Sequence, residues 1–157
     1  PARHPTFGTV GLLGMPELRT VVLRHADQKA SSLEVHTDVE SKKVEELKLN
    51  QNVGIHIWFP SNKLQVRIKA NSEIKVGNVV EEQWKKTPNI SRISYGTLPI
   101  PGTKIHSSFA YEKPAKFERF CVIQVNIKEM DLTHLGARHT RALFTKKTNW
   151  RGSWLAP

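Results

Sequence analysis

Basic and hydroxyl-bearing side chains recur between residues 19 and 67, where strand-like runs end and where a helix is expected to begin. They fall in four segments: residues 19–24 (Arg-Thr-Val-Val-Leu-Arg), 35–38 (Val-His-Thr-Asp), 41–43 (Ser-Lys-Lys) and 65–67 (Gln-Val-Arg). Exposed main-chain N–H groups and the positive end of a helix favour an anion at such a place, and arginine and lysine add charge-assisted hydrogen bonds. The pattern therefore indicates a site for a phosphorylated small molecule.

The composition is that of a basic globular protein. The chain has 157 residues, a length typical of one domain with a substantial core, so we expect a single domain over residues 1–157. Its 24 Lys and Arg against 14 Asp and Glu give a formal net charge of +10. Such an excess attracts nucleic acid, an acidic membrane surface or a phosphorylated metabolite, although a simply soluble surface can have the same composition. No apolar run approaches the roughly 18 residues of a membrane span, and no secretory signal is evident in a sequence that begins at Pro1.

The single cysteine bears on compartment and chemistry. Cys121 lies inside an apolar run over residues 120–125. One cysteine cannot form an internal disulfide, which favours a cytoplasmic setting over a secreted one. A buried strand also lacks the surroundings that stabilise a thiolate, so we interpret Cys121 as a small core residue rather than a nucleophile.

Hydrophobic alternation predicts mostly strands, and two segments have helical spacing. Strands are expected over residues 7–10, 18–24, 33–37, 53–59, from 64 onward, 120–130, 141–145 and 150–155. Helices are expected over residues 41–49 and 79–86, the second ending ahead of Pro88. The glycines and prolines of residues 91–102 predict a loop, and residues 103–118 have no clear pattern. This arrangement indicates a mainly β protein with short helices, built as a six-to-seven-stranded β-barrel, rather than a doubly wound parallel sheet.

Sequence signatures of self-contained catalytic sites are absent. The glycines at 8, 11 and 14 match neither the dinucleotide fingerprint nor a P-loop, and there is no HExxH, paired CxxC or GxSxG. His134 and His139 are five apart, which does not suit metal ligation from one helix, so no metal is expected. The acidic pairs at 45–46 and 81–82 are interpreted as solvated helix faces. An enzyme built on this chain would therefore depend on an organic cofactor.

Four motifs, in order along nearly the whole chain, resemble the pyridoxamine 5′-phosphate oxidase-like family of flavin mononucleotide (FMN)-binding split barrels. Residues 19–24 look like the family's Arg-x-Val-x-Leu-Lys/Arg strand. His36-Thr37 followed by Ser41-Lys42-Lys43 looks like its Tyr/Phe-Thr…Ser-Arg/Lys-Lys segment. Residues 65–67 resemble its Arg-Gln-Val-Arg strand, and the final Trp-Leu-Ala-Pro resembles its Arg-Leu-Ala-Pro terminus.

The resemblance implies a split β-barrel that binds FMN and assigns residues to it. Arg19, Lys42 and Lys43 would hold the FMN phosphate with help from the Thr37 and Ser41 hydroxyls. Main chain at Val21 and Val22 would run beside the flavin ring, Gln65 would reach its pyrimidine side, and Arg141 would contact it from a partner subunit. The implied cofactor-binding set is Arg19, Thr20, Val21, Val22, His36, Thr37, Ser41, Lys42, Lys43, Gln65 and Arg141.

The resemblance also implies a homodimer with FMN at its interface and hydride transfer from a small, possibly phosphorylated substrate to flavin N5. Arg24 stands where the family has a lysine that contacts substrate phosphate, and Arg138 and His139 are the candidates for orienting the substrate. Several positions depart from the pattern of true pyridoxamine-phosphate oxidases. Thr87 rather than arginine precedes Pro88, the arginine of the late Arg-x-His motif is displaced by one position, and the flavin-stacking tryptophan is missing near residues 131–132. Oxidation of vitamin B6 phosphates is therefore not the only reaction to consider.

Alternatives remain open at this point. The same barrel could carry a flavin reductase, a reductase that uses a deazaflavin-like cofactor, or a flavin- or haem-binding protein without turnover. A basic β-barrel that binds nucleic acid is a further alternative. It is less favoured because the basic residues gather at strand and helix ends instead of alternating with aromatics along one sheet face.

Overall fold

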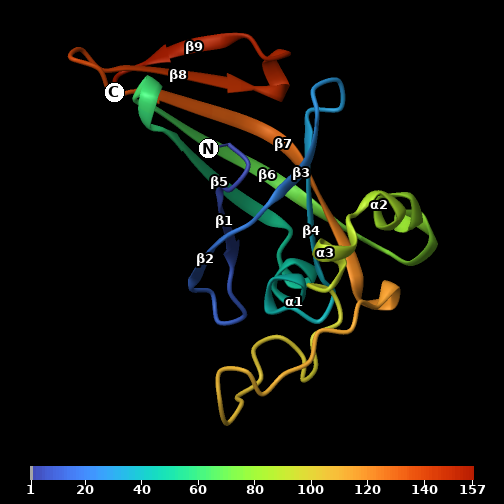
Figure 1. Cartoon of the computed structure of the whole chain (residues 1–157). Helices are drawn as coiled ribbons and strands as arrows, with labels where there is room; N and C mark the ends of the chain where they lie inside the picture. Colours follow the sequence, from blue (N-terminus) through green and yellow to red (C-terminus); the bar gives the residue numbers. More distant parts are fainter. Residues whose placement is uncertain (1) are drawn as a thin grey trace.

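An antiparallel sheet with short helices near one end dominates the computed structural model, which describes residues 2–157 (Figure 1). The main path of the sheet follows the order β2–β1–β5–β6–β7–β4–β3. Its strands are β1 (Thr6–Val10), β2 (Pro16–Thr20), β3 (Leu23–Asp27), β4 (Ser32–Asp38), β5 (Asn52–Phe59), β6 (Leu64–Val76) and β7 (Phe120–His134). The mainly β class is confirmed, but two further strands outside this path bring the sheet to nine strands, more than the predicted six to seven.

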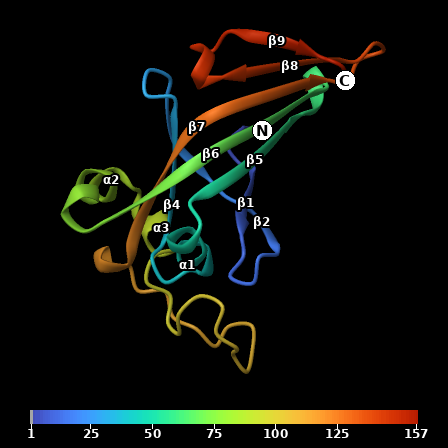
Figure 2. The same ribbon diagram turned by 180° about the vertical axis from the view of Figure 1, so that it is seen from behind.

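A hairpin outside that path adds two strands. β8 (Thr140–Thr145) pairs with β7, and β9 (Gly152–Leu155) pairs with β8. Seen from behind, this hairpin projects beyond the sheet at the end opposite the helices (Figure 2). The final strand begins later than predicted because Asn149 and Trp150 have positive φ values of 52° and 60° and form a turn.

Alternation along the central strands sets which face is buried. In β5 the side chains of Val53, Ile55 and Ile57 are buried, and those between them are exposed. Inward-facing residues of several strands meet α1 in one core that includes Phe7, Val35, Val44, Leu47, Ile55, Ile123 and Val125. The opposite side of β5 and β6 faces away from this core, and we call it the outer face.

The predicted single strand over residues 18–24 is wrong. The run divides into β2, which pairs with β1, and β3, which pairs with β4. Between them the Val21 N–H donates to the Pro5 carbonyl (3.1 Å) and the Leu23 N–H donates to the Arg3 carbonyl (2.9 Å). The chain therefore changes partners at Val21 and Val22, which join the two ends of the sheet path.

The helices lie where the sequence predicts them, with small differences. α1 (Lys42–Leu49) follows Ser41. α2 (Glu81–Lys86) follows a 3₁₀ turn over Gly77–Val80, whose last two residues were predicted to belong to the helix. α3 (Asn89–Arg92) is a short helix at the start of the expected loop. No helix in the described part of the chain is long and apolar enough to cross a membrane.

A long loop over residues 93–116 lies beside α1 (Figures 1 and 2). Asp38, at the end of β4, attaches it to the sheet: its Oδ2 accepts the Gly96 N–H (2.7 Å) and its Oδ1 accepts Nε of Arg119 (2.8 Å). The Lys116 N–H donates to the Tyr95 carbonyl (2.9 Å), which closes the base of the loop. The segment that lacked a sequence pattern is therefore attached at its base to the strand that precedes α1.

Cys121 is fully buried in β7. Burial raises the pKa of its thiol to about 12, so the thiol is protonated at neutral pH. This confirms the interpretation of Cys121 as a core residue.

Candidate functional site

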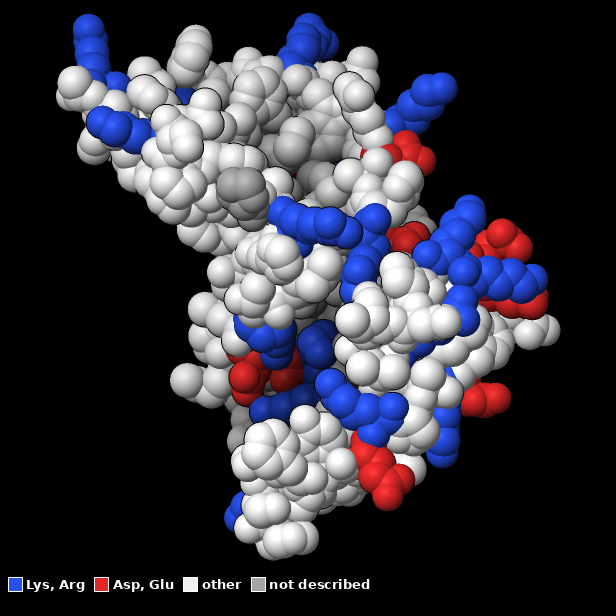
Figure 3. Space-filling model, viewed as in Figure 1, with Lys and Arg blue, Asp and Glu red and all other residues white. Residues whose placement is uncertain are grey.

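A cavity of about 520 Å³ opens where the β2–β3 junction, β4 and the start of α1 meet. It brings together many of the predicted site residues, namely Arg19, Thr20, Val21, Val22, Arg24, His36, Thr37, Ser41 and Lys43. We call it the anion cavity. Figure 3 shows blue Lys and Arg side chains gathered around a hollow on this face of the molecule, with red carboxylates beside it.

Two hydroxyls and one ammonium group meet at the start of α1. The Thr37 and Ser41 hydroxyl oxygens are 3.1 Å apart, and Lys43 Nζ donates to Thr37 Oγ1 at 3.1 Å. Ser41 occupies the N-cap position, but its side chain makes no capping hydrogen bond. Burial, and then the nearby Arg19 charge, hold the pKa of Lys43 below its usual 10.5. An anion placed here would meet donors and the positive end of the helix.

Arg19 is fixed from behind by a buried carboxylate. Its Nη2 donates to Glu46 Oε2 at 2.9 Å, its Nη1 donates to Thr9 Oγ1, and the Thr9 hydroxyl in turn donates to Glu46 Oε2 at 2.6 Å. The Glu46 side chain is fully buried, so its interpretation as part of a solvated helix face is wrong. The physical reason is that α1 packs this face onto β1, where Arg19 offsets the carboxylate charge.

A wall of aromatic and polar groups closes the other side. His36 Nε2 lies 2.7 Å from Glu34 Oε1, and its ring packs edge-on against Phe120 with centroids 4.9 Å apart. From the long loop, Tyr95 lines the cavity with its hydroxyl beside the Arg24 guanidinium, and burial raises the pKa of this tyrosine. Sequence reasoning missed this contribution because residues 91–102 showed only turn signals.

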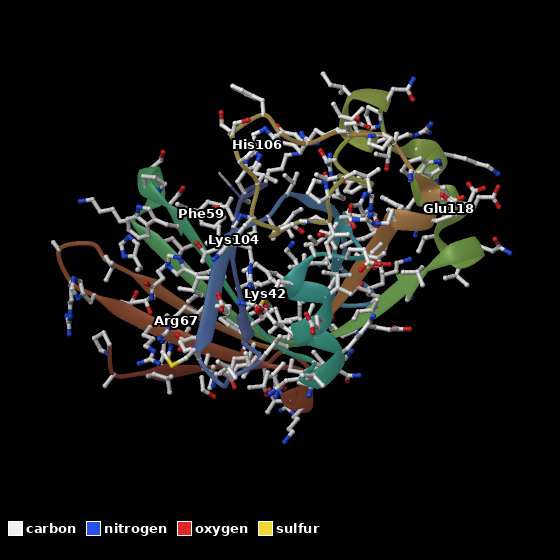
Figure 4. All side chains as sticks on the ribbon, turned by 90° about the horizontal axis from the view of Figure 1, so that it is seen from below. Lys42, Phe59, Arg67, Lys104, His106 and Glu118 are labelled. Atoms are coloured by element: carbon white, nitrogen blue, oxygen red, sulfur yellow. The ribbon has the colours of Figure 1, made fainter. Side chains whose placement is uncertain are left out.

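Lys42 lies apart from the group that it was predicted to join at the start of α1. We call this group, Arg19, Thr37, Ser41 and Lys43, the phosphate cluster. Its Nζ pairs with Glu17 Oε1 at 3.0 Å, its side chain is 60% exposed, and it is not part of the cavity lining. Figure 4 shows it at the start of α1, away from Arg67 on β6. Successive helical residues point about 100° apart, which explains why Lys43 enters the cavity and Lys42 does not.

The remaining predicted residues lie on or near the outer face. His56 Nε2 is 3.3 Å from Gln65 Oε1 across β5 and β6. Arg141 donates through Nη2 to Asp131 Oδ2 (2.7 Å), which also accepts Arg67 Nη2 (2.6 Å). The hydrogen bonds from Arg141 and the charge of Arg67 hold the pKa of Asp131 below its usual value. Within one chain, neither Gln65 nor Arg141 lines the anion cavity.

Arg138 and His139 are exposed on the connection between β7 and β8. Neither contributes to the lining of the anion cavity. Their predicted role in orienting a substrate therefore stays a prediction that depends on a second copy of the chain.

Glu46 and Asp131 carry contacts that the sequence analysis did not assign. The sequence could have indicated the role of Glu46, because Glu46 lies three residues after Lys43 and so shares its helix face. Nothing in the sequence indicated the contacts of Asp131, because its arginine partners lie on two other strands, β6 and β8. No group of three or more His, Cys, Asp or Glu side chains among residues 2–157 is arranged to hold a metal ion.

Residues 1–76 match the family described as "Pyridoxamine 5′-phosphate oxidase, FMN-binding domain". Over 143 residues the chain is 26% identical to pyridoxine/pyridoxamine 5′-phosphate oxidase 2 of Arabidopsis thaliana, an alignment that covers 82% of this chain and 72% of the relative. Over 128 residues it is 33% identical to pyridoxine/pyridoxamine 5′-phosphate oxidase of Leptospira interrogans, covering 81% of this chain. The match spans only 56% of the length of that bacterial relative.

The fold is similar to that of a solved structure. A pyridoxamine 5′-phosphate oxidase-related, FMN-binding protein from Nostoc punctiforme superposes with a TM-score of 0.84 and 22% sequence identity. The alignment covers 99% of this chain and 89% of that chain. At this identity the likeness concerns the fold.

Proposed function

Because the chain belongs to the pyridoxamine 5′-phosphate oxidase-like, FMN-binding family, we propose that it is an FMN-dependent oxidoreductase that works as a homodimer. One observation carries the proposal: Arg19, Lys43 and the hydroxyls of Thr37 and Ser41 converge on one cavity at the start of α1. Charge-assisted bonds and a helix N-terminus are the features that favour a phosphate.

Different parts of the anion cavity suit the two ends of FMN, the phosphate and the flavin ring. At the start of α1, Lys43, Arg19 and two hydroxyls supply hydrogen-bond donors for a phosphate. Arg19 also pairs with Glu46, whereas Lys43 lacks a carboxylate partner among residues 2–157 in the hydrogen bonds and ion pairs of the structure. Beside them, Val21 and Val22 line the cavity where the chain passes between strands, which suits main-chain contacts to a planar ring. The residues present therefore fit a phosphate-terminated cofactor.

When bound, FMN would supply a hydride acceptor for a small substrate. The task of the chain is then to bind and orient. Arg19 and Lys43 would anchor the phosphate, while Arg24 and His36, on the wall away from the phosphate cluster, would face the substrate. A fixed position over the cofactor lowers the entropic part of the barrier.

The homodimer is supported by what one chain leaves exposed. On the outer face the side chains of Leu18 and Trp58 are 70% and 40% exposed, and a groove of about 910 Å³ runs beside Leu18 and Gly54. A two-fold dimer uses the same surface of both chains. In such a dimer Arg138, His139 and Arg141 of one copy would complete the anion cavity of the other.

The test is a comparison of FMN with riboflavin, which lacks the phosphate. We expect Arg19→Ala to weaken FMN binding by about 1.5–3 kcal/mol, the contribution of a charge-assisted bond, with little change for riboflavin. Lys43→Ala tests the same point while leaving the Arg19–Glu46 pair intact. Lys48→Ala, on the exposed side of α1, is the matched control. Fluorescence titration of both flavins gives the dissociation constants.

Two outcomes would count against this function. If the unaltered protein bound FMN and riboflavin with equal affinity, the proposal that the anion cavity binds the FMN phosphate would be contradicted. Tight FMN binding without bleaching of the flavin under anaerobic conditions, across a panel of amines, alcohols and reduced nicotinamides, would favour a flavin-binding protein without turnover.

A further inference from the structure

Arg67, Asp131 and Arg141 form an ionic network on the outer face, across β6, β7 and β8. We call it the Asp131 network. Asp131 lies directly opposite Arg67 in the register of β6 and β7. Its Oδ2 accepts Arg67 Nη2 (2.6 Å) and Arg141 Nη2 (2.7 Å), and its Oδ1 accepts Arg141 Nε (3.0 Å). Each carboxylate oxygen thus accepts a bond from Arg141, and this fork fixes the plane of its guanidinium.

Asp131 is covered, whereas its arginine partners reach the surface. The Asp131 side chain is 11% exposed, and the side chains of Arg67 and Arg141 are 47% and 31% exposed. No hydrogen bond among residues 2–157 uses Nη1 of Arg141. Arg141 is therefore held on one edge by Asp131 and keeps a donor on the other edge for a group outside its own chain.

The place of the Asp131 network suggests what that outside group is. The three side chains line a cavity of about 390 Å³ that also includes Leu18 and Gly54. These two residues lie beside the groove with which, in the proposed dimer, one copy meets the other. A donor in this cavity therefore faces the second copy.

Attachment of β8 to the sheet does not depend on the Asp131 network. β8 pairs with β7 over six residues, from Thr140 opposite His134 to Thr145 opposite Glu129. Main-chain hydrogen bonds thus already set the place of the strand. What the carboxylate adds is the orientation of one side chain, because a long arginine would otherwise sample many rotamers.

We infer that Asp131 is a positioning residue for the cofactor: it holds Arg141 in the orientation in which Nη1 donates to the flavin ring of FMN bound in the second copy. The inference rests on the proposed function, in which Arg141 of one copy completes the anion cavity of the other. The ring offers carbonyl oxygens as acceptors. A side chain that is held before the ligand arrives loses little rotamer freedom on binding, so a fixed Arg141 binds the ring more tightly than a mobile one.

The experiment is a double-mutant cycle on flavin binding, with Asp131→Asn, Arg141→Ala and the double variant of the full chain. Fluorescence titration gives the dissociation constants for FMN and riboflavin. We expect Arg141→Ala to weaken both flavins about tenfold, the loss of a hydrogen bond from a charged group. Asp131→Asn should weaken both about threefold, within the range for ordering one long side chain. In the double variant, Asp131→Asn should add no further loss, because Arg141 is gone.

The direction of the change separates positioning from charge. Asp131→Asn removes a negative charge, so Coulomb attraction alone would make the variant bind the anionic FMN more tightly, whereas loss of positioning weakens binding. The loss should be the same for FMN and riboflavin, because Arg141 meets the ring that both flavins share. Glu73→Gln makes the same change of charge on β6, outside the cavity lining. It is the matched control and should leave both dissociation constants unchanged.

The outcomes distinguish the inference from the proposed function. Flavin affinity that does not respond to Arg141→Ala contradicts the site shared between two copies, and with it the proposed function. If Arg141→Ala weakens binding but Asp131→Asn leaves it unchanged or tightens it, the positioning role of Asp131 alone is overturned. The same holds if Asp131→Asn costs as much in the Arg141→Ala background as in the unaltered protein.

Thermal melting and light scattering show whether each variant is folded and keeps the mass of the unaltered protein. If Asp131→Asn does not fold, Asp131→Glu takes its place in the cycle. Glutamate keeps the charge but moves the carboxylate by one methylene group, so it should also weaken both flavins, and only while Arg141 is present.

Discussion

Arg19 is held between a buried carboxylate and a cavity for an anion. Glu46 is fully buried, and its Oε1 has no hydrogen-bond partner among residues 2–157. The guanidinium of Arg19 and the hydroxyl of Thr9 are the groups that offset its charge. Removing one partner of such a pair leaves a charge in a poorly solvated place, which is costly. Glu46 therefore has two roles: it stabilises the fold, and it sets the position of Arg19.

We predict that Glu46→Ala lowers the free energy of unfolding by about 3 kcal/mol, the lower end of the range for breaking a buried ion pair, because Arg19 remains partly solvated. Glu46→Gln keeps the acceptor and should cost less. Urea denaturation measures both. Glu45→Ala, the exposed neighbour on the same helix, is the control, and equal losses for the two alanine variants would contradict this account.

Lys43 gives the site a dependence on pH. Its pKa is lowered by burial and by the Arg19 charge, so it loses its proton at a lower pH than an ordinary lysine. A cation that binds phosphate contributes only while it is protonated. We predict that FMN affinity falls as pH rises into the alkaline range, toward and through this lowered pKa.

The control for that pH dependence is Lys43→Arg. Arginine stays protonated throughout the accessible range, so the variant should hold FMN with a flatter alkaline profile even if its affinity at neutral pH is lower. Equilibrium dialysis between pH 7 and 10 measures both profiles. If FMN affinity fell at alkaline pH in Lys43→Arg as it does in the unaltered protein, a group other than Lys43 would be responsible.

The cavity wall that comes from the long loop depends on a glycine. Gly96 has a φ of +126°, and a Cβ placed there would lie 2.1 Å from the Pro114 carbonyl oxygen. Its N–H bonds to Asp38, and Tyr95 beside it lines the cavity. The loop is thus positioned by contacts between its two ends and β4.

We predict that Gly96→Ala weakens FMN binding severalfold and lowers the melting temperature, since the clash displaces the Tyr95 wall. Gly77→Ala is the matched control: its φ is +72° and a Cβ there meets nothing within 4 Å, so it introduces backbone strain of about 1–3 kcal/mol without the clash. Calorimetry and flavin titration measure both variants. If Gly77→Ala lost FMN and Gly96→Ala kept it, the part of the cavity wall formed by the long loop would not be needed for FMN binding.

At the scale of the whole molecule, apolar side chains of the β1–β2 hairpin are exposed to solvent in a single chain. Leu18 lies beside the groove on the outer face, and Leu13 and Met15 in the same β1–β2 hairpin are 95% and 67% exposed. The Asp131 network on this face holds Arg141 in place across three neighbouring strands. Both features suit a surface that meets a second copy.

We predict that Leu18→Glu converts a dimer into a monomer of 17.8 kDa and weakens FMN binding, because a buried charge opposes association. Leu49→Glu changes a leucine of similar exposure (75%) on α1 and should leave the dimer intact. Light scattering after gel filtration gives the masses. A dimeric Leu18→Glu variant would place the interface elsewhere.

Much of the fold was predictable because it depends on local periodicity. Alternating residues of β5 predict one buried face, and Ser41 predicts the start of α1. The division between β2 and β3 was not predictable, because Val21 and Val22 are strand-forming residues and only their bonds to the N-terminal segment end the strand. Similarly, most of the predicted phosphate-binding residues share one cavity, but Lys42 does not.

The sequence by itself determined the class of the protein and the residue types that can hold a phosphate, since hydrophobic alternation and short motifs are properties of neighbouring residues. Only the tertiary structure decided that Glu46 is buried against Arg19, that Asp38 holds the long loop and that Glu34 and Arg24 line one cavity. These contacts join residues up to 81 positions apart. Their burial and charge depend on which strands become neighbours, and no local pattern records that choice.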